Sequence, residues 1–106
     1  MFRTHAKFLT GATTPETKLS LSRNAAVVGL FTDADCPTTT LKAKIYDTDE
    51  NGLPLYTDAG EWSMNIQANR AYSIPWDLFA GFISIEFILG VAPAADSQLK
   101  LSVRDV

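Results

Sequence analysis

Apolar and polar residues alternate along two segments near the C-terminus. In residues 82–89 every second position from Ile83 onward is apolar, and Ser84 and Glu86 stand between those positions. Residues 98–104 repeat the pattern, with Leu or Val alternating with polar residues. Because successive side chains of a strand point to opposite faces, both segments predict strands with one face on a core and one in solvent.

Shorter apolar segments punctuated by turn residues fill the rest of the chain. Strands are predicted at residues 18–22, 25–31, 39–46, 53–57, 62–67 and 71–74. Residues 25–31 are more continuously apolar, which indicates burial on both faces or at an interface. Residues 75–81 begin with Pro and end with Gly, which predicts one helical turn. We therefore expect an all-β protein, an antiparallel β-sandwich of about seven to nine short strands with at most a single-turn helix; jelly-roll and Ig-like topologies both remain open.

The chain of 106 residues has the size of one domain. Residues 17–106 are expected to form the β-sandwich domain, and residues 1–16 an N-terminal arm or an edge strand. As an arm, this segment could add a strand to a partner's sheet, and as an ordinary first strand it would belong to the sandwich. Its alternating Arg3, His5 and Lys7 are basic in an acidic protein. The predicted interface residues are Phe2, Arg3, His5 and Phe8.

Composition narrows the function classes. The hydrophobic share is 46% and the net charge is −3. Along the sequence no basic cluster is present that would follow a phosphate backbone, so nucleic acid is not an expected partner. The apolar runs are far shorter than the ~20 residues that span a bilayer, so no membrane association is expected. Without a visible secretory signal, we expect synthesis in the cytoplasm.

One acidic loop has the spacing of a calcium ligand set. Asp47, Asp49, Asn51, Gly52 and Asp58 occupy positions one, three, five, six and twelve of such a loop. Strand-like flanks and the Asn-Gly pair are equally typical of an ordinary hairpin turn. The turn is favoured and no metal is predicted, although calcium remains an alternative.

Catalytic groups are sparse. His5 is the only histidine, and the only cysteine, Cys36, follows two acidic residues that disfavour its thiolate. No nucleophile with a neighbouring base, and no phosphate-binding or dinucleotide-binding motif, can be found. We predict no catalytic residue, no cofactor and no enzymatic activity.

Two tryptophans could either pack or bind. Trp62 is in phase with Met64 and Ile66, which favours a core position. Trp76 lies in the segment predicted as a helical turn, and a plug that closes one end of the sandwich is favoured over a sugar-stacking platform.

The order of features from residue 25 to residue 104 resembles a class of small all-β proteins from the structural gene modules of tailed bacteriophages. The resemblance rests on an alternating strand at 41–45, an acidic hairpin at 47–52, a Leu-Phe-Ala-Gly turn at 78–81, and strands at 82–89 and 98–103. It implies a virion component and transfers no active-site residue.

Within that class, we expect a capsid decoration (cement) protein on the capsid surface. Its partner would be the major capsid protein, and it would form a homo-oligomer, with a trimer favoured. The alternatives are a neck, tail or fibre-associated subunit, and a carbohydrate-binding β-sandwich that aids host attachment through Trp76.

Overall fold

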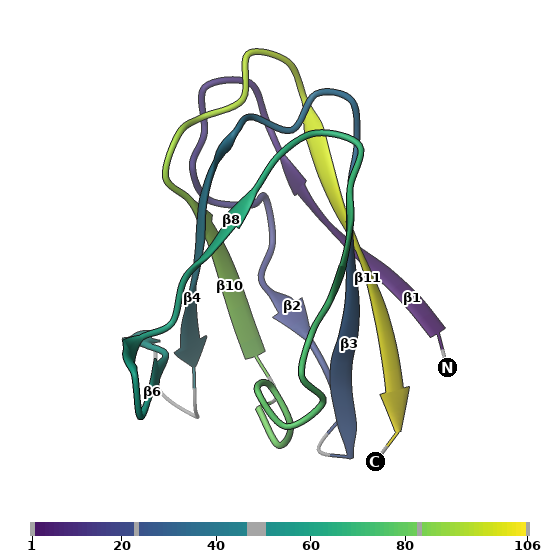
Figure 1. Ribbon diagram of the computed structural model, residues 1–106, viewed down its shortest axis with the longest axis vertical. Helices are drawn as coiled ribbons and strands as arrows, with labels where there is room; N and C mark the ends of the chain where they lie inside the picture. The colour runs from purple at the N-terminus through teal and green to yellow at the C-terminus, as the bar shows by residue number, and fades with distance from the viewer. Residues whose placement is uncertain (1, 23, 47–50, 83, 106) are drawn as a thin grey trace.

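The computed structural model describes residues 2–22, 24–46, 51–82 and 84–105, which form two antiparallel sheets packed face to face (Figure 1). Sheet A has the strand order β1 (Phe2–Phe8), β11 (Ser97–Asp105), β3 (Ala25–Thr32) and β9 (Ala71–Ser73). Sheet B has the order β2 (Leu19–Ser20), β10 (Ser84–Leu89), β4 (Thr39–Tyr46) and β5 (Leu53–Pro54), and β8 (Met64–Ile66) also pairs with β4. A separate small hairpin joins β6 (Tyr56–Thr57) to β7 (Gly60–Glu61).

The all-β sandwich is thus confirmed, with eleven strands and no helix among the described residues. Residues 75–81 form consecutive turns in place of the helical turn that the Pro and Gly predict. The amide of Leu78 donates to the carbonyl of Pro75 at 3.1 Å, and Gly81 takes a φ of +84°. The positive φ explains the glycine, because other residues rarely adopt that conformation.

The two alternating segments supply opposite walls of one core. β10 belongs to sheet B and β11 to sheet A, so they face each other across the sandwich instead of pairing. Their inward side chains are nearly or fully buried, as the alternation predicts: Ile85, Phe87, Leu89, Leu99, Leu101 and Val103. Between the sheets, the buried ring of Phe79 packs edge-on against two other rings. Its centroid lies 5.3 Å from that of Trp62 and 5.5 Å from that of Phe87. Trp62, predicted as a core residue, is partly buried and packs against this core.

Residues 2–8 form an edge strand of sheet A. β1 pairs with β11 along its whole length, from Phe2 opposite Val103 to Phe8 opposite Ser97. Alternation turns Ala6 and Phe8 inward, where Phe8 has no exposed surface. The free edge of β1 is partly occupied, since the carbonyl of Lys7 accepts a hydrogen bond from the amide of Glu16 at 2.9 Å.

Asp33, just after β3, connects three loops. Its carboxylate accepts hydrogen bonds from the Ser97 hydroxyl at 2.8 Å, the Gln98 amide at 2.8 Å and the Asp35 amide at 3.1 Å. Its carbonyl also accepts from the amide of Asn69 at 3.1 Å. One acidic side chain thereby ties the end of β3 to the start of β11.

Candidate functional site

The predicted interface residues divide between the surface and the core. Arg3 and His5 are exposed on the outer face of sheet A. Phe8 lies on the inner face and is fully buried, so it is not available to a partner. The backbone of Phe2 belongs to β1, and its side chain lies outside the described residues. Of the predicted interface residues whose side chains are described, only the basic Arg3 and His5 are therefore accessible.

Strand pairing extends this cationic surface. Lys100 of β11 stands opposite His5 of β1, and on its other side it stands opposite Phe31 of β3. Along β11, Arg104 is also exposed. We call the outer face of sheet A formed by Arg3, His5, Lys7, Lys100 and Arg104 the basic face. It unites the first and last strands of the chain, which explains why the sequence shows no basic cluster.

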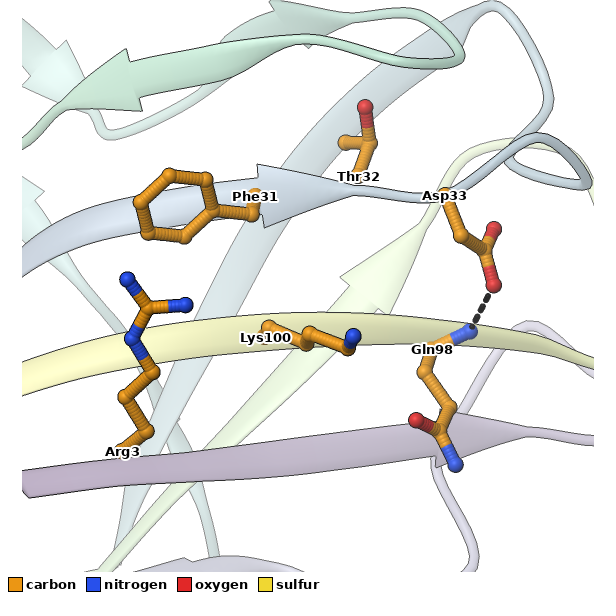
Figure 2. A pocket seen from close by; sticks show the side chains of 6 residues that line it. All are labelled: Arg3, Phe31, Thr32, Asp33, Gln98 and Lys100. Atoms are coloured by element: carbon orange, nitrogen blue, oxygen red, sulfur yellow. Dashed lines mark hydrogen bonds between the residues drawn. The ribbon is translucent and has the colours of Figure 1, made fainter.

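A shallow hollow of about 240 Å³ lies in the basic face. Figure 2 shows the six residues that line it: Arg3, Phe31, Thr32, Asp33, Gln98 and Lys100. The guanidinium of Arg3 reaches across β11 and lies 4.8 Å from the centroid of the Phe31 ring. A cation above an aromatic face is attracted to the ring electrons, so this contact fixes the direction of the Arg3 side chain.

Two carboxylates near the basic face, those of Asp33 and Glu16, already have partners. The Asp33 carboxylate accepts a hydrogen bond from the Gln98 amide at one end of the hollow (Figure 2) and another from the Ser97 hydroxyl. A Glu16 carboxylate oxygen lies 3.8 Å from the Lys7 ammonium. Within the described parts of the chain, no ion pair to Arg3 or Lys100 is found. The cations that line the hollow, Arg3 and Lys100, can therefore bind an anionic group.

A second, more open hollow of about 490 Å³ lies beside the β6–β7 hairpin. Tyr56, Asp58, Asp77 and Phe82 are among its lining residues, and the Tyr56 side chain is 64% exposed. Nearby in sequence, Trp76 is 59% exposed, so the prediction that it is a buried plug is wrong. An exposed aromatic ring of this kind can stack on a ligand.

The other candidate positions offer little chemistry. Burial, followed by the charge of Asp33, raises the pKa of the Cys36 thiol to about 11, which keeps it protonated at neutral pH. Asp47 and Asp49 of the calcium alternative lie outside the described residues. No group of three or more potential metal ligands occurs among the residues that are described. Across the same residues, no helix has the length and apolar character needed to cross a membrane.

By its fold the protein is an all-β, two-sheet antiparallel sandwich, and exposed basic residues lie on the outer face of sheet A. Among solved structures, the chain is similar to the SPBc2 prophage-derived protein YomS, with a TM-score of 0.56 and 14% sequence identity. The match covers 97% of this chain and 94% of YomS, so it extends over the whole sandwich. No protein family and no curated protein matches the sequence.

Proposed function

We propose that this protein is a structural component of a tailed-phage virion, and specifically a capsid decoration protein that binds the lattice of the major capsid protein and stabilises the shell. The observation that supports it most is the likeness in fold, over nearly the full length of both chains, to a prophage-derived protein. The order of sequence features that resembles phage structural proteins points in the same direction.

The physical character of the sandwich suits a decoration role. Its core is continuous between two sheets, so the domain can transmit force without a moving part. The basic face offers a contact surface whose charge is opposite to that of the protein as a whole. Repeated over a shell, many modest contacts would add up through avidity. The proposal includes a homo-oligomer of closed symmetry, as most soluble homo-oligomers are, and a trimer is the favoured form.

Copy number tests the proposal. Purified particles are digested, and this protein is quantified against the major capsid protein by mass spectrometry. A decoration protein is expected at a large fraction of the capsid copy number. A few copies per particle would instead support the neck, tail or fibre alternative, and absence from particles would refute a virion role altogether. Native mass spectrometry of the isolated protein tests the trimer separately.

Truncation of the N-terminal segment is a poor test of partner binding. β1 forms a seven-residue ladder with β11, and Phe8 is fully buried. Removing residues 1–9 is therefore expected to damage the fold along with any interface. Substitutions at exposed positions of the basic face separate the two effects.

One observation favours a second candidate, a carbohydrate-binding module. The exposed ring of Trp76 and the hollow that contains Tyr56, Asp58 and Asp77 have the aromatic and carboxylate groups that bind sugars. Glycan-array binding that is lost in Trp76→Ala, with unchanged thermal stability, would support it. Wild-type protein that binds no glycan would refute it.

A further inference from the structure

We propose that the basic face of sheet A is the docking surface for an acidic segment of a partner polypeptide, and that a carboxylate of this segment binds between the Arg3 guanidinium and the Lys100 ammonium. The inference rests on the proposed function only for the identity of the partner. The chemistry of the surface stands on its own geometry.

Both cations are available, and Arg3 is also held in place. Arg3 is oriented by its contact with Phe31, 4.8 Å from the ring centroid, and this contact leaves guanidinium N–H groups free to donate. Lys100 projects from β11, which pairs with β1 on one side and β3 on the other. A guanidinium that is already oriented loses less entropy when it binds a carboxylate.

Small residues beside the cations let the Phe31 ring lie close to the sheet. The row of residues across the sheet at Arg3 continues through Ser102, Gly29 and Ser73. A methyl group at Gly29 would come within 3.3 Å of the Ser102 side chain, so the two strands are closely apposed here. Next to this low row stands the row of Lys100 and Phe31. The Phe31 ring lies over this row, 3.7 Å from where a Gly29 Cβ would stand, and Ser102 is only 8% exposed, so an extended partner segment would lie on the Arg3–Phe31 pair and against Lys100.

Charge complementarity selects an acidic partner. The protein has a net charge of −3, so the cations of the basic face are outnumbered by carboxylates elsewhere. On the outer face of sheet B the lysines are compensated, since Lys42 lies 3.5 Å from Glu61 and Lys44 stands opposite Glu86. An approaching acidic surface would be attracted to sheet A and repelled by most other surfaces, which fixes the orientation of docking.

A polypeptide fits this face better than a nucleic acid. The basic face is short and has Asp33 at one end of its hollow, which opposes a continuous line of phosphates. Nucleic-acid surfaces need several cations spaced along the backbone. A single carboxylate between two cations, with a short chain on either side, matches the size of the hollow.

The test compares two double variants, Arg3→Ala/Lys100→Ala on sheet A and Lys42→Ala/Lys44→Ala on sheet B. Each removes two cations from strand positions and changes the net charge equally. Binding to undecorated capsids is expected to weaken at least about tenfold in the sheet A variant and less than about twofold in the sheet B variant. The charge-retaining Arg3→Lys/Lys100→Arg variant is expected to keep most of the binding. Equal weakening in both alanine variants would overturn the proposal.

An assay without capsids separates this inference from the proposed function. Amide NMR shifts of the labelled protein are followed during titration with a blocked hexaglutamate peptide. Saturable shifts centred on Arg3, Phe31 and Lys100, absent from the Arg3→Ala/Lys100→Ala variant, would support the docking surface even if the protein is absent from virions. Shifts scattered over the molecule, or stronger binding of a short DNA duplex to the same residues, would overturn the polypeptide assignment.

Discussion

Replacing Asp33 by alanine removes the acceptor that ties the end of β3 to the start of β11. Two donors are then stranded: the hydroxyl of Ser97, a residue only 2% exposed, and the amide of half-buried Gln98. A buried donor without a partner costs about 1–3 kcal/mol, so a loss of about 3 kcal/mol is expected from the pair. The third donor, the amide of exposed Asp35, can bond water instead.

This loss is large for a domain whose net stability is of the order of 5–15 kcal/mol. Urea unfolding followed by tryptophan fluorescence measures it, because Trp62 packs against the core and its environment changes on unfolding. With a denaturant dependence of about 1.5 kcal/mol per molar urea, the midpoint should fall by about 2 M.

Asp35→Ala is the matched control, since it removes a carboxylate from the same loop at an exposed position. Its effect is expected to stay within about 0.5 kcal/mol. The double variant Asp33→Ala/Ser97→Ala should lose less unfolding free energy than the two single variants lose together, because it has no Ser97 hydroxyl left without an acceptor. If Asp33→Ala and Asp35→Ala shift the midpoint equally, or if the cycle is additive, the role assigned to Asp33 is wrong.

Three further outcomes are expected. Phe79→Ala should cost about 3–5 kcal/mol of stability because the ring is fully buried, whereas Trp76→Ala should stay within about 0.5 kcal/mol; similar urea midpoints for the two would contradict the burial. Cys36, whose pKa burial raises to about 11, should react with a thiol reagent far more slowly in the native protein than in denaturant, and rapid native labelling would contradict this. Hydrogen bonds from the amide and hydroxyl of Thr10 lower the pKa of Asp96 below 3.8, so their stabilisation is present at neutral pH and is lost as the pH falls through the lowered pKa. Thermal unfolding should therefore show Asp96→Ala less stable than wild type at neutral pH, with a gap that narrows in acid; a gap independent of pH would exclude this link.

Period-two alternation located the strands well where one face is buried. The inward residues of β4 and β10, such as Leu41 and Phe87, are buried as the pattern predicts. Alternation is a local property and contains no information about which strands pair. The adjacent segments that became β10 and β11 accordingly belong to different sheets, and the pairing of β1 with β11 had no sequence signal.

The candidate site was harder to predict for the same reason. Arg3 and His5 were recognised as basic, but Lys100 joins them only through strand pairing. Phe8 was assigned to an interface, but its side chain points to the face opposite that of Lys7 and is therefore buried in the core. Trp76 shows the opposite error, because the same turn buries Phe79 in the core and leaves Trp76 59% exposed. Side-chain type alone did not decide burial at these positions.

The ladder between the first and last strands also has a kinetic consequence. β11 lies between β1 and β3, so until the residues of β11 have left the ribosome β1 has no partner strand in sheet A and β3 can pair only with β9. Pairing Phe2 with Val103 closes a loop of almost the whole chain, and non-local closure of this kind is slow, typically milliseconds to seconds in all-β domains. During that interval β1 and β3 have no partner strand between them. Early termination before β11 would therefore yield an aggregation-prone fragment and not a smaller folded domain.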